Sequence, residues 1–430
     1  MRERLRILVL YDESQTAAGC NWDHLQALAS SRHDVYFQSG TSPALLDLRP
    51  YDAVVVHHTI HTSLPIPGGA EHISPMVESA LAAFDGGKIL FVQDDYEGTE
   101  VTRKRMDRIG FDVIYTIIPS FEDARTVYPP NRFPHMKVVP VLAGYAPPGP
   151  QAPTKPIADR ACRIAYRGRP LPFQYGDLGQ EKIEIGRHMK AACLARGVPH
   201  DIAWDEGSRI YGGAWHDFLT SARATLVTES GSNVFDPDWS LRLSVERLLE
   251  QKPATTYDEA RDLLLIHDSG IKMNQISAKV FEAIALRTVI IAFPGGYSGV
   301  LKPEHYIRLD KDFANVDEVF RKLEDTGTLQ AMVDRAYDDI IASGRWSYDR
   351  LTEIFDDDIE RVAAIRPRAR IDIQPLCLVP PISGARLVAA QLVTNRPLRP
   401  EETKREILST LEGYAIATAR AAFKQEGANV

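Results

Sequence analysis

The sequence is poor in cysteine, and it lacks the motifs and long apolar runs that define several large classes of protein. Its four cysteines are widely spaced and form no CxxC pair (Cys20, Cys162, Cys193 and Cys377). Such spacing argues against a zinc site or a disulfide framework and favours a reducing compartment. No apolar run approaches the 18 residues of a membrane span, and the run after the basic start MRERLR is too short for a signal peptide. We therefore expect a cytoplasmic protein.

The sequence also lacks clusters of positively charged residues. The chain carries a net charge of −8 with a pI of about 5.9, and no lysine or arginine run stands out. A duplex nucleic-acid binder would usually show a basic face, so we expect no nucleic-acid partner. The first apolar strand is followed by YDESQTAAGC, with no GxGxxG motif, and no GxxxxGK[ST] motif occurs anywhere. These absences argue against a dinucleotide-binding dehydrogenase and against a P-loop enzyme.

What the sequence does contain is alternating strand and helix signals over 430 residues, enough for two domains. Short β-branched runs recur through the first 145 residues, at 6–10, 34–38, 52–58, 88–93, 112–118 and 137–142. Segments with helical character, such as 74–87, lie between several of them. This alternation predicts an α/β domain over residues 1–145, with a doubly wound parallel sheet covered by helices on both faces.

A proline-rich stretch at 146–160 then reads as an interdomain linker. Strand and helix signals resume over 161–364, which predicts a second doubly wound domain that includes helices near 315–323, 328–342 and 348–363. The polar segment 232–274 interrupts this domain as an insertion. Residues 365–430 form a C-terminal extension with a predicted helix at 401–423. That extension either packs back across the domains or mediates oligomerisation, and the sequence does not decide the oligomeric state.

In open α/β sheets ligands bind beyond the carboxyl ends of the strands, and with two such domains the natural site is the cleft between them. The second domain opens with AYRGRPLPFQYGDLGQEK, in which Arg167, Arg169 and Lys182 surround a glycine-rich loop. Two arginines and a lysine near a helix N-terminus can clamp a diphosphate. The alternative is an ordinary solvated basic loop.

A second candidate lies in ISAKVFEAIALRTVIIAFPGGYSG, residues 276–299, where one carboxylate interrupts an otherwise apolar helix. Ser277 stands at the expected N-cap, with its hydroxyl available to a backbone N–H or a phosphate. Glu282 lies one turn further along the helix, where a carboxylate can accept both hydroxyls of a ribose. The alternative interpretation is a solvent-facing glutamate on an amphipathic helix.

The order of helix, buried strand and Gly-Gly turn in FEAIALRTVIIAFPGGYSGVL resembles the nucleotide-sugar site of GT-B glycosyltransferases, especially the retaining family 4. The resemblance covers residues 160–365 and implies a GT-B fold of two Rossmann-like domains facing a cleft. It also implies that Glu282 binds the ribose and that Arg169 and Lys182 neutralise the leaving diphosphate. The turn Gly295, Gly296, Tyr297 and Ser298 would then lie near the diphosphate or the sugar.

The sequence departs from this family pattern at one position. The family pairs Glu282 with a second acid eight residues earlier, and here that residue is Asn274. Glu229 follows a predicted strand in TLVTESGSN, so we take it as the substitute and as a candidate contact to the donor sugar.

The N-terminal domain should hold the acceptor, since two of its predicted strands end in polar loops. His57 and His58 follow one strand, and Asp94 and Asp95 follow another. Histidine and carboxylate groups can also bind metal, but the resemblance implies a metal-independent enzyme, so we expect no metal and no cofactor. An inverting enzyme would use one of these groups as a general base, whereas a retaining enzyme would not need one.

Together these features predict a cytoplasmic, retaining glycosyltransferase that takes a nucleoside-diphosphate sugar, with UDP as the expected nucleotide. Its acceptor would be a glycan or a lipid-linked sugar of bacterial surface polysaccharide synthesis, with peripheral membrane contact left open. Two alternatives remain at this point: a sugar-nucleotide epimerase of the same architecture, and a non-catalytic protein that binds a nucleotide or sugar.

Overall fold

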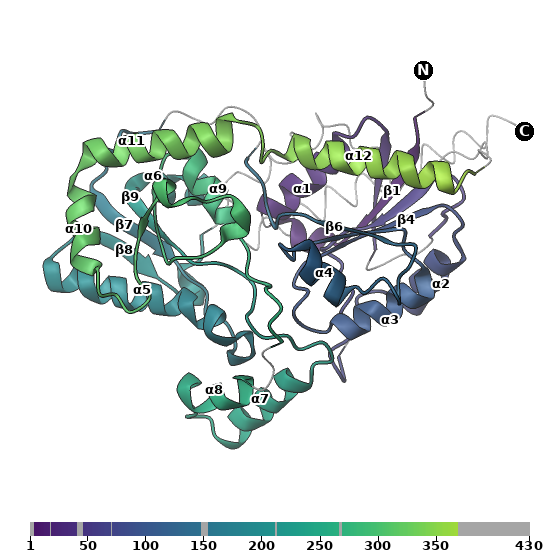
Figure 1. Cartoon of the computed structure of the whole chain (residues 1–430), viewed down its shortest axis with the longest axis horizontal. Helices are drawn as coiled ribbons and strands as arrows, with labels where there is room; N and C mark the ends of the chain where they lie inside the picture. Colours follow the sequence, from purple (N-terminus) through teal and green to yellow (C-terminus); the bar gives the residue numbers. More distant parts are fainter. Residues whose placement is uncertain are drawn as a thin grey trace, which may run out of the picture.

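The computed structural model describes residues 4–17, 19–40, 46–69, 71–147, 154–210, 213–265 and 269–368. Within these ranges the chain forms two parallel sheets that lie side by side, each covered by helices (Figure 1). The predicted α/β class, with two Rossmann-like units, is confirmed. The predicted helix at 401–423 and most of the proline-rich linker lie outside the described residues.

The first sheet has six parallel strands in the order β2-β1-β3-β4-β5-β6. Its strands are β1 (Arg6–Tyr11), β2 (Asp34–Ser39), β3 (Ala53–Val56), β4 (Gly87–Val92), β5 (Val113–Thr116) and β6 (Lys137–Pro140). Its helices are α1 (Gly19–Ala29), α2 (Pro75–Ala83), α3 (Thr99–Ile109) and α4 (Phe121–Val127). The β3 and β5 strands are buried along their whole length, as expected for a sheet covered on both faces.

The second sheet has five parallel strands in the order β11-β10-β9-β7-β8. Its strands are β7 (Cys162–Arg167), β8 (His200–Ala203), β9 (Ala222–Val227), β10 (Val289–Ala292) and β11 (Tyr306–Arg308). Its helices are α5 (Gly176–Arg196), α6 (Gly213–Ser221), α9 (Ala278–Ala285), α10 (Val316–Glu324) and α11 (Thr326–Ala336), and a π-helical segment, Tyr337–Ala342, continues α11.

Both sheets reverse their strand order at equivalent places, between β1 and β3 in the first and between β7 and β9 in the second. In doubly wound folds such a reversal opens a crevice at the carboxyl ends of the strands, where ligands bind. The loops after β1, β3, β7 and β9 are therefore the first places to look for a site.

The helix α12 (Tyr348–Ile365) packs on the first sheet rather than the second. Its apolar residues Leu351, Phe355 and Ile359 join the core formed by β1, β3 and β4. Figure 1 shows the chain crossing from α11 over the second unit to α12 over the first. Sequence pattern alone places residues 348–363 in the second domain. The difference arises because an apolar helix face shows that a helix packs, but not on which sheet.

The predicted insertion at 232–274 contains two helices, α7 (Ser240–Gln251) and α8 (Tyr257–Leu265), which project below the two sheets in Figure 1. Its two ends return to the first unit, since Phe235, Ile271 and Met273 pack in the core between that sheet and α2 and α3. Backbone hydrogen bonds join Gly98 to Asp236 at 2.8 Å and Asp236 to Tyr96 at 2.7 Å. The insertion therefore ties the two units together on the side opposite α12.

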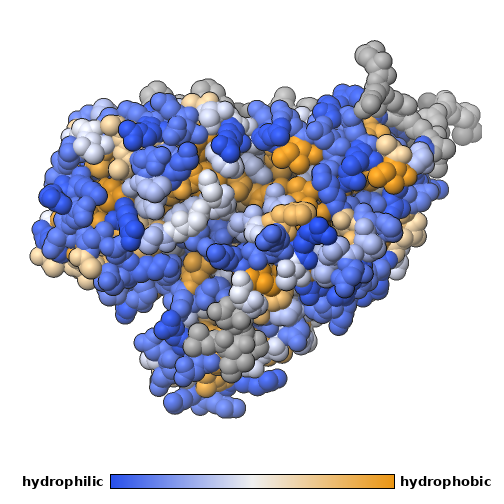
Figure 2. Space-filling view, viewed as in Figure 1, coloured by the Kyte–Doolittle hydropathy of each residue, from blue (hydrophilic) through white to orange (hydrophobic). Residues whose placement is uncertain are grey.

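No helix of the described ranges combines the length and the hydropathy that a membrane span needs. Figure 2 shows that hydrophilic side chains dominate the face drawn there, with hydrophobic ones in separate small groups. Peripheral membrane contact and cytoplasmic location both remain predictions.

Candidate functional site

Two lysines lie close together where α5 and α9 begin, and neither is paired with a carboxylate. Lys182 donates a hydrogen bond to the Ser230 hydroxyl at 3.1 Å, and Lys279 donates one to the Arg167 carbonyl at 2.9 Å. Both side chains are half-buried, and within the described part of the chain neither forms an ion pair. Because an ammonium group has three N–H donors, each lysine keeps further donors for a ligand.

The pKa values of these lysines reflect burial and mutual repulsion. Burial lowers the pKa of Lys182 to about 8; the Asp94 carboxylate opposes this shift and the Arg169 guanidinium adds to it. Burial also lowers the pKa of Lys279 to about 8, with a further decrease from Lys182 and an opposing effect of Glu282. A bound anion would relieve this repulsion and raise both pKa values. The cluster of Lys182, Lys279 and Arg169 is therefore the candidate site for an anion.

Local sequence explains how the lysines come together. Gly168 follows β7, and a Cβ there would lie 3.1 Å from the Lys182 carbonyl, so glycine lets this loop pack on α5 without a shift of its neighbours. The Tyr166 hydroxyl donates to the same carbonyl at 2.8 Å. On α9, Ser277 is the N-cap and accepts a bond from the Lys279 amide, as the sequence predicted. Lys279 thus stands in the first turn, beside the positive end of the helix dipole.

Glu282 lies one turn after Lys279 on α9, near α1 of the first unit. Its Oε2 accepts a 2.7 Å hydrogen bond from the Trp215 indole. The Glu282 charge also reaches α1, where it reinforces the effect of burial in raising the pKa of Asp23 to about 7 and of Cys20 to about 11. Glu282 is therefore half-buried and hydrogen-bonded near the first unit, and the solvent-facing interpretation is wrong.

Glu229 connects three loops of the second unit. Its Oε1 accepts from the Tyr297 amide at 2.7 Å, and its Oε2 accepts from the Asn274 side chain at 2.7 Å. A Cβ at Gly295 would lie 2.6 Å from Oε2, so the turn needs glycine at that position. The carboxylate is buried and holds the Gly-Gly turn in place. Its predicted contact with the donor sugar stays a prediction.

The Gly-Gly turn presents backbone rather than side chains. The Tyr297 side chain is fully buried and its hydroxyl donates to the Phe293 carbonyl at 2.7 Å. The Ser298 hydroxyl accepts from the Ile276 amide at 3.1 Å. The prediction of ligand contact is therefore wrong for the Tyr297 side chain. For Gly295, Gly296 and Ser298 it stays a prediction.

Arg167 does not belong to the anion cluster. Its guanidinium makes hydrogen bonds of 2.8 and 3.0 Å to the Asp201 carboxylate and 2.9 Å to the Ser208 carbonyl, and it lies over the Phe218 ring. The predicted phosphate contact of Arg167 is wrong in this geometry, because an ion pair on β8 already occupies the group. Arg169 is exposed and within reach of the Lys182 charge.

The two predicted histidines of the first unit are buried. His57 is 0% exposed; its Nε2 lies 2.9 Å from His24 Nδ1, and its Nδ1 accepts from the Thr59 amide at 3.2 Å. His58 Nε2 lies 3.1 Å from Asn21 Oδ1. Burial lowers the pKa of both His57 and His58 well below the ordinary histidine value. The prediction that His57 contacts the acceptor is wrong, because its ring is enclosed by protein.

His24, His57 and His58 are the one group in the described ranges whose ligand atoms could surround a metal ion. Two of them, His24 and His57, instead share a hydrogen bond, and His58 bonds Asn21. Because the Thr59 amide donates to His57 Nδ1, the proton of this neutral ring is on Nε2 and points to His24 Nδ1. This hydrogen bond uses the lone pair of His24 Nδ1. The expectation that the enzyme requires no metal stays a prediction.

Asp94 and Asp95 point in opposite directions. Asp95 is buried and accepts a hydrogen bond from the Tyr128 hydroxyl, and burial raises its pKa to about 7. Asp94 is exposed, has a left-handed φ of 59°, and accepts from the Tyr96 hydroxyl at 2.7 Å. Because the charge of Asp94 acts on Lys182, this residue faces the anion cluster. Asp94 therefore remains an acceptor-side candidate, whereas the prediction for Asp95 is wrong.

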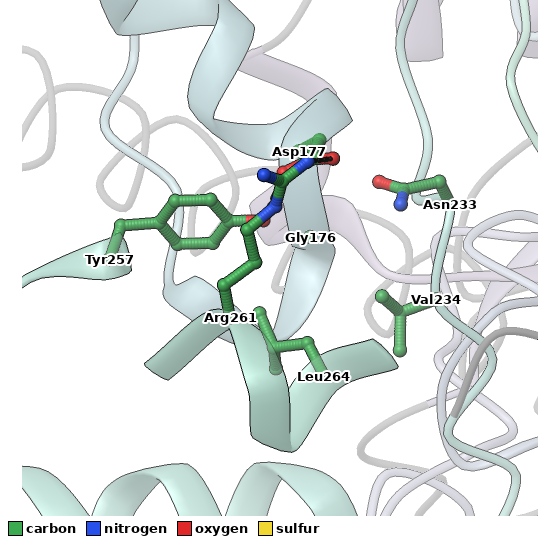
Figure 3. A pocket seen from close by; sticks show the side chains of 7 residues that line it. All are labelled: Gly176, Asp177, Asn233, Val234, Tyr257, Arg261 and Leu264. Atoms are coloured by element: carbon green, nitrogen blue, oxygen red, sulfur yellow. Dashed lines mark hydrogen bonds and ion pairs between the residues drawn. The ribbon is translucent and has the colours of Figure 1, made fainter. Parts of the chain in front are cut away.

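A small cavity lies between the start of α5 and α8 (Figure 3). Tyr257 and Arg261 both point to Asp177 and bind its two oxygens at 2.7 Å. On the other side Asn233 accepts from the Leu178 amide at 2.9 Å. The charged groups of this cavity satisfy one another, so it is a packing feature of the insertion rather than a second site.

Comparison with known proteins yields no family model and no curated protein that matches this sequence. Solved glycosyltransferase structures align with it at low identity. HepE of Anabaena, in complex with UDP and glucose, has 10% identity and a TM-score of 0.45, and the alignment covers 83% of this chain and 100% of that one. An alpha1,3-fucosyltransferase has 10% identity and a TM-score of 0.42, covering 83% and 90%.

TarM has 8% identity and a TM-score of 0.38, and the alignment covers 71% of this chain and 54% of that one. This chain therefore spans about half the length of TarM. Likenesses at this level assign neither a family nor an activity, so the function has to be argued from the site itself.

Proposed function

We propose that this protein is a glycosyltransferase that takes its sugar from a nucleoside diphosphate sugar. The observation that carries the proposal is the pair Lys182 and Lys279, which are half-buried and form no ion pair among the described residues. Lys279 also stands one turn of α9 before Glu282. A bound diphosphate would provide the anionic partner that the two lysines do not have in the described structure. The ribose hydroxyls supply hydrogen-bond donors for Glu282.

In the proposed reaction the bond between the anomeric carbon and the diphosphate oxygen breaks, and the acceptor hydroxyl oxygen forms the new bond to that carbon. Lys182, Lys279 and Arg169 stabilise the charge that develops on the departing diphosphate. We propose a retaining mechanism, in which the proton of the acceptor hydroxyl goes to a phosphate oxygen of the donor. The lysines supply the charge neutralisation, so the proposed reaction needs no metal ion and no cofactor.

The proposed acceptor is a glycan or lipid-linked sugar, bound at the mouth of the first sheet where Asp94 faces the lysines. The tie between Gly98 and Asp236 brings this loop and the second unit together. Burial of the reacting groups between two units favours transfer over hydrolysis, because it excludes water. We place the reaction in bacterial surface polysaccharide synthesis and take UDP as the nucleotide.

A thermal-shift and calorimetry panel of UDP-, GDP-, ADP- and CMP-sugars tests the donor class. We expect one nucleotide to stabilise the wild-type protein and to lose at least about tenfold in affinity when Lys182 or Lys279 is replaced by methionine, since hydrogen bonds to charged groups contribute about 1.5–3 kcal/mol. Lys322→Met is the matched control, because Lys322 pairs with Glu318 on the outer helix α10. No stabilisation by any nucleotide would contradict the proposal.

The two alternatives differ in their products. A transferase releases nucleoside diphosphate faster when acceptor is present, whereas a free epimerase product would be a nucleotide sugar of changed configuration. A non-catalytic binder would retain the nucleotide and release nothing. Following nucleoside diphosphate release with and without a panel of glycan acceptors separates these three outcomes.

A further inference from the structure

The helix α9 carries a lysine and a glutamate three residues apart that do not pair with each other. Lys279 and Glu282 stand at i and i+3, a spacing at which ammonium and carboxylate groups commonly form an ion pair. Here Lys279 Nζ binds the Arg167 carbonyl at 2.9 Å and Glu282 Oε2 accepts from the Trp215 indole at 2.7 Å. No ion pair joins the two in the described structure.

The residue that contacts both groups is Trp215, in the first turn of α6. The Lys279 ammonium lies 5.3 Å from the centre of the Trp215 ring and 5.1 Å from that of Tyr166. The indole N–H is directed to Glu282. Phe218 stacks on the indole at 5.5 Å with an interplanar angle of 25°, which holds the ring in this orientation.

These contacts leave both charges intact. An aromatic face attracts an ammonium group without neutralising it, and an indole N–H binds a carboxylate as an uncharged donor. An ion pair between Lys279 and Glu282 would instead cancel the charge that a diphosphate needs and would occupy the oxygens that ribose hydroxyls need.

We propose that Trp215 is a positioning residue that keeps Lys279 and Glu282 apart, so that one binds the diphosphate and the other the ribose of the same nucleotide. This inference rests on the proposed function and adds to it a specific determinant of donor affinity. Trp215 lies outside the predicted motifs, and its proposed role is to prevent an ion pair between Lys279 and Glu282.

The variant Trp215→Phe tests the inference, because it keeps an aromatic ring and removes the indole N–H. We expect the released Glu282 to pair with Lys279 and the dissociation constant for UDP, measured by calorimetry, to rise about tenfold. Trp346→Phe is the matched control, since Trp346 packs beside α9 in the core away from the lysines. It should bind UDP as the wild type does.

The pH dependence of UDP binding separates positioning from mere packing. The charges that face Lys279 are Lys182 on α5 and Glu282 on α9, and the other contacts are the Arg167 carbonyl and the Tyr166 and Trp215 rings. Direct pairing with Glu282 would raise the pKa of Lys279. The high-pH limb of UDP binding should therefore move to higher pH in Trp215→Phe. A role in packing alone would weaken binding without moving that limb.

The double variant Trp215→Phe/Glu282→Gln completes the test. With no carboxylate to pair, loss of the indole N–H should cost little beyond the effect of Glu282→Gln alone. Additive losses, or a Trp215→Phe protein with wild-type affinity and an unmoved pH limb, would overturn the inference while leaving the donor site in place. Failure of the wild type to bind any nucleotide would instead overturn the proposed function.

If the Trp215→Phe protein unfolds at too low a temperature to assay, the variant Glu282→Gln offers a second measurement. Glu282→Gln removes the one charge that raises the pKa of Lys279, so its pH limb should move to lower pH than in the wild type. An unmoved limb would show that Glu282 lies too far from Lys279 to pair with it, even without Trp215. That result would also contradict the inference.

Discussion

The side chain of Asn274 donates a 2.7 Å hydrogen bond to the carboxylate of Glu229. Asn274 stands eight residues before Glu282, where the resemblance implied an acid, and Glu229 was the predicted substitute. The two residues are therefore in contact, and an acid from the end of β9 lies beside the position where the sequence has none. Glu229 also holds the Tyr297 amide, so it serves the Gly-Gly turn whatever its role toward the donor sugar.

The first prediction concerns the stability of this turn. Glu229→Ala leaves the buried Tyr297 amide without an acceptor, so we expect a loss of about 1–3 kcal/mol in the free energy of unfolding. Glu229→Gln keeps an acceptor oxygen and should lose less. Urea denaturation of both variants checks this order. An alanine variant as stable as the wild type would show that the carboxylate does not support the turn.

The second prediction concerns pH and the lysines. The pKa of Lys182 and of Lys279 is about 8 in the folded protein against 10.5 ordinarily. Between these values the unfolded chain binds more protons than the folded one, so stability without ligand should rise with pH from about 8 to 10.5. The penalty is fully present below pH 8.

Affinity for UDP should change in the opposite sense, falling above pH 8 as the lysines lose their charge. Melting temperatures across this pH range, with and without UDP, measure both trends. In Lys182→Met and Lys279→Met the rise in ligand-free stability should shrink, because one contributing group is gone. Parallel curves with and without UDP would contradict a role for the lysines in binding.

The third prediction separates Asp94 from Asp95. Asp94→Asn should reduce transfer with little change in stability, because this side chain is exposed and faces the lysines. Asp95→Asn should leave transfer unchanged, since Asp95 is buried against Tyr128. The rate of product formation and the melting temperature of each variant check this prediction. An equal loss of transfer in both variants would contradict a separate role for Asp94.

Asp95 also has its own pH signature. Burial raises its pKa to about 7, so the folded state holds a proton that the unfolded state releases above pH 4. Because of this group, the free energy of unfolding of the wild type should fall as the pH rises from about 4 to about 7. Asp95→Asn removes the titration and should gain stability relative to the wild type as pH increases over that range.

The fourth prediction concerns α12. Phe355 is 0% exposed and packs against the first sheet, so Phe355→Ala should cost about 3–5 kcal/mol of stability. The loss should appear in the first unit, because the contacts of the helix lie there. Hydrogen exchange in β1 and β4 measures it. Accelerated exchange in β10 alone would show that α12 belongs energetically to the second unit.

The parallel sheets follow from local sequence alone. Continuous β-branched runs such as AVVV and VIIA are buried on both faces, which only a sheet covered by helices permits. The N-cap at Ser277, the glycine turn after β10 and the lysine in α5 are equally local signals. Each depends on neighbours within a few residues, so each could be predicted.

Side-chain partners could not be predicted in the same way. Arg167 was predicted to contact a phosphate but pairs with Asp201. His57 was predicted to contact the acceptor but is buried against His24. Trp215 and Lys279 carried no motif and became visible only once α6 and α9 were side by side. A carboxylate or an aromatic ring brought from a distant segment decides whether a charged group is free, and pattern along the chain does not contain that information.

The sequence by itself determined two parallel α/β units, the strand ends at which a site can form, and the presence of a carboxylate and cations there. Hydrophobic periodicity and turn chemistry act over short distances, and they suffice for this much. Only the tertiary structure decided that α12 covers the first sheet and that the insertion joins the two units. It also decided that neither Lys182 nor Lys279 forms an ion pair among the described residues. Those outcomes depend on which surfaces meet, and the free energy of burying charge and apolar area is set by residues far apart in the chain.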